Sequence, residues 1–319
     1  TVGALTTTDL AMTFTAGTGN SGTFVQTDDA STIATGTGAI TVNADLIALS
    51  TTVNTVTTTG AITLQPTTAG RPIVIGAAGA ASDFALSTAE IAALTNNASG
   101  ITIGKADSGA VTISAITFND PITILGAAMS VTALQAAANN ITLTSTSTID
   151  ELADNNTTDI TTSGTLALTA QGAIGAAGAT GALDLTVGTL QATTNSGGIF
   201  VLESSALTVG GTGVQTTGGD AEIQITLTAG NLTLEDDITA NGSGNVTLVL
   251  SAASAQLITG DVNDDIVSGT GDISITADVL TLVGGNITSV GGALTLQPLS
   301  AGQSVGISGG AGTFSLTTA

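Results

Sequence analysis

The sequence contains no cysteine, histidine, tryptophan or tyrosine, and only two of its 319 residues, Arg71 and Lys105, are basic. The absence of cysteine excludes disulfides and thiol chemistry. The scarcity of basic residues leaves a net charge of -22. Nucleic acids and anionic lipids are therefore excluded as electrostatic partners, because both require clustered Lys or Arg.

Long apolar runs are also missing, since Thr, Ser or Asn interrupts every apolar segment. We therefore expect no membrane insertion. The chain is nevertheless 42% hydrophobic and only 8% charged, which distinguishes it from a disordered acidic tail. Its aromatic residues are six phenylalanines, so the core must be built from aliphatic side chains.

The sequence repeats itself over a long interval. The heptad GAITLQP at 60–66 returns as GALTLQP at 292–298, 232 positions later, and weaker matches relate residues 27–89 to residues 260–319. A long internal period in a chain of short strands is typical of stacked repeat proteins. We expect residues 1–319 to form one continuous β-solenoid that belongs to a longer protein.

Short segments in which Val, Ile or Leu alternates with Thr or Ser recur at intervals of roughly 20 to 25 residues. Such alternation predicts strands with one buried face. The buried face is expected to include Ile40, Val42, Ile62, Leu64, Ile101, Ile103, Val111 and Ile113. Gly, Asn or Asp stands at the start of many of these segments. These residues are favoured in tight turns, so we expect them at the corners between strands.

Three architectures can close such a chain. A propeller requires blades of about 40 to 50 residues with an aromatic signature, which is missing. A series of β-sandwiches requires hairpin turns such as Asn-Gly or Asp-Gly between paired strands. Asn241-Gly242 is the only such dipeptide in the sequence. The sequence therefore favours an all-β fold, a parallel β-helix or β-solenoid with short loop decorations, two or three strands per turn and about fourteen turns.

Helical patterns are almost missing. Ser87 and Glu90 form a capping-box pattern that predicts a short helical turn within 87–94, and residues 131–138 are a second candidate.

Four stretches resemble the repeats of giant bacterial surface exoproteins of the filamentous-haemagglutinin type. They are LQP at 64–66, AGRPI at 69–73, FALSTAE at 84–90 and ITIGKADSG at 101–109. The resemblance covers residues near 37–114 and 270–319. It implies a right-handed parallel β-helix that is exported to the cell surface and acts there as an adhesin, filament or sheath.

One acidic loop has the ligand spacing of a calcium site. Oxygen ligands stand at its positions 1, 3, 5 and 12, which are Asp261, Asn263, Asp265 and Asp272. However, Ile266 replaces the glycine that the sharp turn requires, and the first copy of the repeat retains only Asp28. Two interpretations stay open: a calcium site and a solvated acidic turn.

The acidic groups at 28–29, 150–159 and 235–237 are expected to be corners that face water and keep the protein soluble, although some could bind divalent cations between neighbouring molecules. Arg71 becomes Gln303 in the second copy, which argues against an obligatory role. Lys105 and Asp107 are expected to form a local surface pair.

An enzymatic function is disfavoured. Polysaccharide-cleaving β-helices need a carboxylate pair or a strong base, flanked by basic and aromatic residues, and this chain has one Arg and no His, Tyr or Trp. An ice-binding Thr face is disfavoured too, because the Thr-x-Thr pattern of residues 142–146 does not recur in the other segments. We expect no catalytic residues and no cofactor other than calcium at the acidic loop.

These observations predict a structural extracellular protein that forms a stiff filament, sheath or cell-surface stalk by stacking, with further copies of itself as partners. The alternative is an adhesin segment that binds a surface glycan or receptor through loops such as 77–99.

Overall fold

The computed structural model describes residues 4–17, 21–26, 31–153, 155–178, 180–307 and 314–316; Asp28, Asp29 and Asp154 lie outside them. The fold is a β-solenoid of about 12 stacked turns, rather than the expected fourteen, and consists almost entirely of parallel strands. The chain divides into two compact units, Thr1–Ser147 and Thr148–Ala319.

The first unit contains short strands and one helical turn. Its elements are β1 (Leu5–Thr6), β2 (Met12–Ala16), β3 (Thr23–Val25), β4 (Ile33–Ala34), β5 (Ile40–Ala44), β6 (Leu46–Ala48), β7 (Val56–Thr57), β8 (Ala61–Gln65), β9 (Ile73–Ile75), β10 (Phe84–Leu86), α1 (Thr88–Ile91), β11 (Gly100–Gly104), β12 (Val111–Ile113), β13 (Ile116–Thr117), β14 (Ile122–Gly126), β15 (Met129–Val131), β16 (Leu134–Gln135) and β17 (Ile141–Ser145).

A ladder of aliphatic side chains runs through the first unit. Strands β2, β5, β8, β11, β14 and β17 pair in parallel, in that order. Their register stacks Ile40 on Ile62, Ile62 on Ile101, and Ile101 on Ile122. All eight residues predicted for the buried face, from Ile40 to Ile113, are at most 3% exposed. The predicted aliphatic core is confirmed.

The second unit contains the longer strands. Its elements are β18 (Ile149–Glu151), β19 (Ile160–Ala170), β20 (Leu183–Thr194), β21 (Ile199–Glu203), β22 (Leu207–Thr216), β23 (Ile223–Leu227), β24 (Leu232–Leu234), β25 (Ile238–Ala240), β26 (Val246–Leu250), β27 (Gln256–Thr259), β28 (Ile266–Ser268), β29 (Ile273–Thr276), β30 (Val279–Leu282), β31 (Ile287–Ser289), β32 (Leu294–Gln297), β33 (Val305–Ile307) and β34 (Phe314–Leu316).

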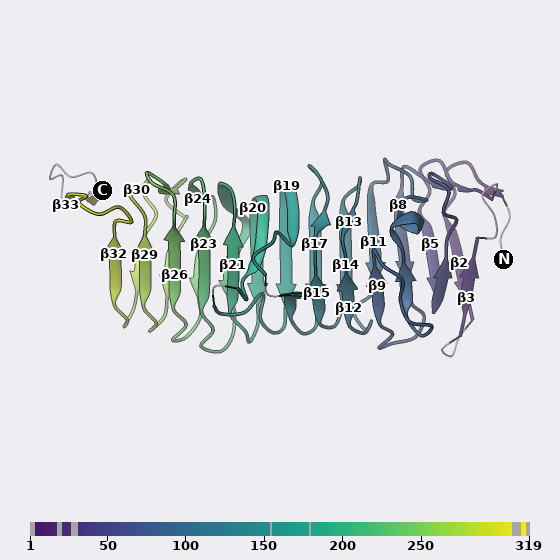
Figure 1. Cartoon of the computed structure of the whole chain (residues 1–319), viewed down its shortest axis with the longest axis horizontal. Helices are drawn as coiled ribbons and strands as arrows, with labels where there is room; N and C mark the ends of the chain where they lie inside the picture. Colours follow the sequence, from purple (N-terminus) through teal and green to yellow (C-terminus); the bar gives the residue numbers. More distant parts are fainter. Residues whose placement is uncertain are drawn as a thin grey trace. The chain divides into compact units, whose positions relative to one another are not determined.

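Several turns of the second unit carry three strands each. β23, β24 and β25 form one turn and pair with β26, β27 and β28 of the next, which pair in turn with β29, β30 and β31. Figure 1 shows β23, β26, β29 and β32 side by side. Ile223, Val246 and Ile273 stack within this ladder and are fully buried.

The internal sequence repeat is also a structural repeat. Strands β5 to β10 of the first copy correspond in order to β29 to β34 of the second. Burial differs between the copies, because Ile62 on β8 lies between β5 and β11 and is 0% exposed. Its counterpart Leu294 lies on β32, which pairs with β29, and is 46% exposed. Burial of the inner face of these strands therefore depends on contact with a neighbouring turn and not on the heptad sequence alone.

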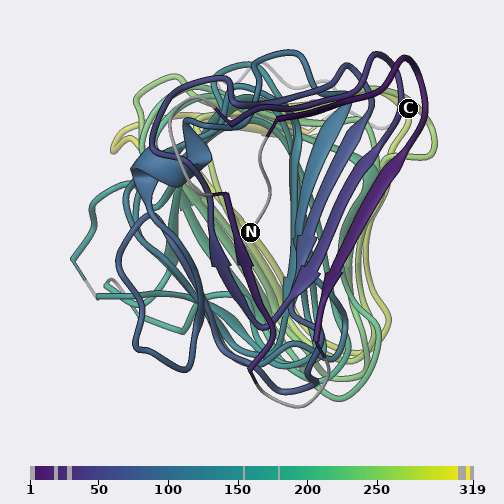
Figure 2. The same cartoon turned by 90° about the vertical axis from the view of Figure 1, so that its right-hand side faces the viewer.

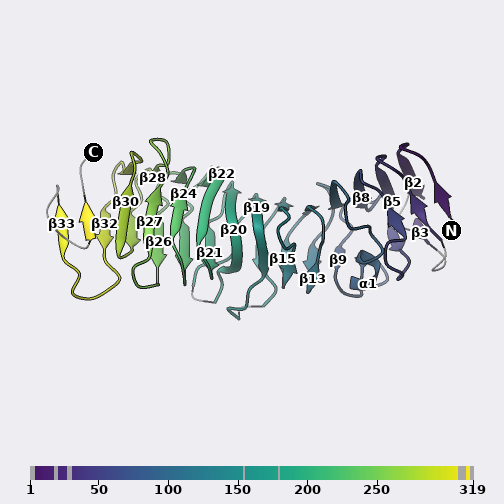
Figure 3. The same cartoon turned by 90° about the horizontal axis from the view of Figure 1, so that it is seen from above.

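One of the two helix predictions is confirmed. α1 begins after Ser87, whose hydroxyl accepts the Glu90 amide while the Glu90 carboxylate accepts the Ser87 amide. Figures 2 and 3 show α1 outside the strands of the first unit. It is four residues long, and no helix in the described part of the chain has the length and hydropathy of a membrane span.

The prediction of a helix within 131–138 is wrong. This region contains the end of β15 and all of β16. Val131 pairs with Ile113 and Leu134 with Ile116, and both side chains are fully buried. Pairing with the preceding turn thus overrides a local pattern that is compatible with a helix.

The register makes a testable prediction for β8. Ile62→Asp should lower the free energy of unfolding by about 4 kcal/mol or more, because it places a carboxylate without a partner in the core. Thr63→Asp should cost less than about 1 kcal/mol, because Thr63 points to the opposite face and is only half-buried. Urea denaturation followed by circular dichroism measures both, and equal midpoints for the two variants would contradict the register.

Candidate functional site

Three buried carboxylates converge in the second unit. One oxygen each of Glu151, Asp159 and Asp184 lies within 4.8 Å of the other two. The side chains are 7%, 2% and 4% exposed, respectively. Among the described residues this is the one group of three or more acidic side chains with such a geometry. We call it the acidic triad.

Strand register brings Asp159 and Asp184 together. Ile160 of β19 pairs with Leu185 of β20, so the preceding residues, Asp159 and Asp184, are also neighbours. The Asp159 amide donates to the Asp184 carbonyl at 2.8 Å, and the Asp184 amide donates to Oδ2 of Asp159 at 3.1 Å. Glu151, the last residue of β18, supplies the third carboxylate.

Asp184 is buried on the outer side of its strand. Leu183 and Leu185 are both 0% exposed and belong to the core, so alternation directs Asp184 away from that core. Its low exposure shows that other segments cover it. Oδ2 of Asp184 is fully buried and has no hydrogen-bond partner.

Burial changes the titration of these groups. It raises the pKa of Asp159 to about 7, and the charges of Asp184 and Asp150 act in the same direction, against the hydrogen bond from the Asp184 amide. Burial also raises the pKa of Asp184. Ionisation of all three carboxylates of the triad is therefore energetically unfavourable unless protons or a cation neutralise their charge.

The expectation that the acids of 150–159 face water is wrong for Glu151 and Asp159. The same expectation for the acids of 235–237 holds for Glu235 and Asp237, which are exposed. The sequence did not predict the triad. Asp159 precedes a strand and Asp184 lies between two core leucines, and in a single strand both positions indicate exposure to solvent. No signal in the sequence shows that a covering segment is present.

The three acids of the predicted calcium loop, Asp261, Asp265 and Asp272, do not form a group within 4.8 Å of one another among the described residues. Asp261 and Asn263 are exposed and form a local turn, in which the Asn263 amide donates to Oδ1 of Asp261 at 2.7 Å. Asp265 is half-buried and Asp272 is exposed. Calcium binding at this loop stays a prediction.

Asp265 and Asp272 instead link successive turns. Asp265, before β28, accepts the Asn286 amide at 2.7 Å, and its own amide donates to Asp237 of the preceding turn at 2.9 Å. Asp272, before β29, accepts the Ala293 amide at 2.7 Å. These carboxylates accept hydrogen bonds from backbone amides at the corresponding corner of the next turn. The amides have no partner within the strand pairing, so the acids have a structural role.

A buried acid that accepts hydrogen bonds from a neighbouring turn is present in both copies of the sequence repeat. Asp45 accepts the amide and the hydroxyl of Thr68, both at 2.8 Å. Asp278, its counterpart, accepts the amide and hydroxyl of Ser300 at 2.8 and 2.7 Å. Burial of Asp45 opposes ionisation, but the hydrogen bonds from Thr67 and Thr68 outweigh it and lower the pKa.

Both basic residues are engaged with acids of the first unit. Nε of Arg71 lies 3.4 Å from Oδ1 of Asp45, and both side chains are buried. Nζ of Lys105 lies 3.1 Å from Oδ1 of Asp107 on the surface, as the sequence predicts, and also donates to the Thr67 carbonyl. Arg71 is thus a buried anchor in the first copy, where the second copy has Gln303.

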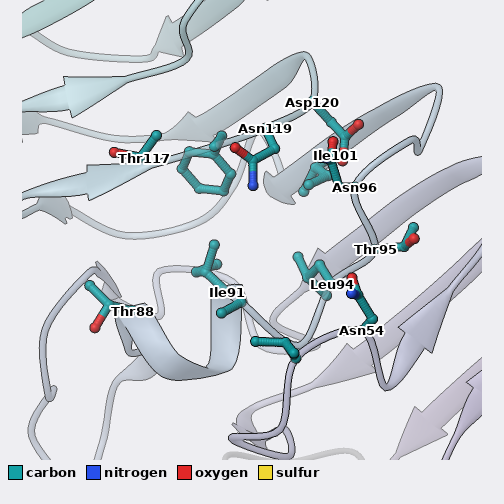
Figure 4. Close-up of a pocket in the computed structure, with 13 residues that line it drawn as sticks. Asn54, Thr88, Ile91, Leu94, Thr95, Asn96, Ile101, Thr117, Asn119 and Asp120 are labelled. Atoms are coloured by element: carbon teal, nitrogen blue, oxygen red, sulfur yellow. The ribbon is translucent and has the colours of Figure 1, made fainter.

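A pocket of about 380 Å³ lies beside α1 in the first unit. Figure 4 shows Ile91 and Leu94 on one side of it and Thr117, Asn119 and Asp120 on the other. The exposed side chains of Asn54, Asn96 and Asn119 add polar groups to its lining. Asp120 is 4% exposed, and burial raises its pKa, although it accepts the Asn97 amide at 2.9 Å.

Comparisons with protein families, curated proteins and solved structures find no match to this chain. Functional conclusions therefore rest on the fold and on the chemistry of the residues above.

The raised pKa of Asp159 predicts a pH dependence. A folded-state pKa of about 7, above the ordinary value of 3.8, means that protonated Asp159 contributes stability at low pH and that this contribution is lost as the pH rises through about 7. In chelator-treated buffer, the melting temperature should therefore fall between pH 5 and pH 8. Asp159→Asn should reduce this fall by several degrees, because its amide does not titrate.

Calorimetry at pH 5, 6, 7 and 8 measures the effect. Asp236→Asn is the control, since it removes one acid of the same type outside the triad. Identical pH profiles for the wild type and Asp159→Asn would contradict the prediction.

Proposed function

We propose that this chain is a structural, non-catalytic segment of an extracellular bacterial filament, sheath or cell-surface stalk, as its resemblance to filamentous-haemagglutinin-like exoproteins implies. The observation that carries the proposal is the aliphatic ladder of each unit, in which one turn after another stacks in register. Such stacking makes each turn depend on its neighbours and gives a stiff, cooperative array.

Charge and composition support the same function. The acids are distributed along the chain, and the corner acids in the second unit cap amides of the next turn. A net charge of -22 opposes sideways clumping of such molecules, which favours thin assemblies. The absence of His, Cys, Tyr and Trp removes most side chains that act as bases, nucleophiles or sugar-stacking platforms in enzymes.

Exposed apolar side chains support self-association. Leu294 is 46% exposed, although its repeat counterpart Ile62 is fully buried between two turns. Leu10 and Val290 are also exposed, at 68% and 76%. Exposed apolar side chains favour contact with another molecule, and we propose that a second copy of this chain supplies that contact.

Electron microscopy and analytical ultracentrifugation over a range of concentrations test this proposal. We expect fibres whose length increases with concentration. Leu294→Asp should shorten or abolish them, because it replaces an exposed apolar side chain with a charge. Thr295→Asp, which adds the same charge at the neighbouring exposed position, should not.

A strictly monomeric wild type at all concentrations would contradict self-assembly. Equal effects of the two variants would show that net charge, rather than the exposed apolar side chain, controls association.

The pocket beside α1 favours a second candidate, an adhesin that binds a surface glycan. Exposed amides of Asn54, Asn96 and Asn119 are suited to sugar hydroxyls, and the pocket lies next to the loop region 77–99. A glycan array tests this function. Asn119→Ala should weaken binding of any glycan found at least tenfold, and Asn263→Ala, an exposed change outside the pocket, should leave it unchanged.

A further inference from the structure

We propose that the acidic triad of Glu151, Asp159 and Asp184 binds one calcium ion. The site lies within the second unit and joins β18, the corner before β19, and β20. It is distinct from the Asp261 loop, which carries the ligand spacing of a calcium site in the sequence.

The spacing of the oxygens fits a shared cation. Calcium binds oxygen ligands at about 2.3–2.6 Å, so two ligands of one ion are at most about 5 Å apart. One oxygen from each triad residue lies within 4.8 Å of the others. Three carboxylates that repel one another hold this geometry most readily around a positive charge.

A second observation comes from Asp184. Its carboxylate belongs to the triad, its side chain is 96% buried, and its Oδ2 has no hydrogen-bond partner and no contact with solvent. Other acids of the second unit accept an amide of the next turn, as Asp265 and Asp272 do at the corners before β28 and β29. A buried carboxylate that has an unsatisfied oxygen and belongs to a group of three carboxylates is what a cation site requires.

No basic side chain of this chain can supply the missing charge. The sequence contains only Arg71 and Lys105, and these pair with Asp45 and Asp107 in the first unit. Buried charges in proteins are paired or coordinate metal ions. A bound cation would compensate the negative charge of the triad.

The donor set selects calcium among common cations. All three ligands are carboxylates, which favour hard cations, and the chain has no His or Cys for softer metals. Magnesium requires near-ideal octahedral geometry and keeps several waters, whereas calcium accepts irregular sets of six to eight oxygens. Backbone carbonyls and water would complete the shell. The ion would tie the segment between β18 and β19 to β20.

The test uses the whole chain, treated with chelator and dialysed, at pH 7.5. Isothermal titration with calcium chloride should give one site per chain with a Kd below about 1 mM. Millimolar calcium should raise the melting temperature by several degrees, since a ligand that binds only the folded state stabilises it. Equal concentrations of magnesium should have a much smaller effect.

Matched variants locate the ion. Asp184→Asn keeps the size of the side chain and removes its charge, and it should weaken calcium binding at least tenfold. Asp261→Asn makes the same chemical change in the exposed loop and should leave the affinity unchanged. Circular dichroism establishes that each variant is folded. If Asp184→Asn does not fold, the wild-type titration together with Asp261→Asn still decides the outcome.

Several results would overturn the proposal. The wild type could bind no calcium at pH 7.5, which would mean that shared protons neutralise the triad. Asp184→Asn could bind as tightly as the wild type, or Asp261→Asn could lose binding, which would place the ion at the acidic loop. An equal effect of magnesium would overturn the assignment to calcium.

Discussion

In-register parallel pairing of each turn with the next is the interaction on which the rest of this structure depends. Because side chains alternate along a strand, a slip of one residue would move every Ile and Val of the ladder to the outer face. The observed register places Ile62 between Ile40 and Ile101, and each fully buried aliphatic side chain contributes roughly 1.5–3 kcal/mol. The same register aligns the corners, so it also determines where polar groups meet.

At those corners the acids act mainly as hydrogen-bond acceptors. Only two basic residues are present, and Asp237, Asp265, Asp272 and Asp278 of the second unit accept hydrogen bonds from backbone amides or hydroxyls of neighbouring turns. The pair Asp45 and Asp278 shows that this device is part of the long repeat, because both capture the amide and hydroxyl of one residue about a turn later. The acidic composition therefore has a structural cause as well as an effect on solubility.

The acidic triad departs from this rule and is informative for that reason. Asp159 follows the corner pattern, since it accepts the Asp184 amide. Asp184, in contrast, has a buried oxygen that no amide satisfies, and it faces two further carboxylates. Three buried carboxylates meet at this place in the second unit, and a bound ion would stabilise the stack there.

The sequence by itself determined the class of fold and the inner face, because the two-residue alternation at Ile40, Val42, Ile62 and Leu64 is a local property of each strand. It also determined the cap of α1, since Ser87 and Glu90 are three residues apart. Only the tertiary structure decided that residues 131–138 contain the end of β15 and all of β16 instead of a helix, because pairing with β12 and β13 is not local. It alone decided the triad as well: Glu151, Asp159 and Asp184 come from three segments, and burial of their charges depends on covering segments that no single strand specifies.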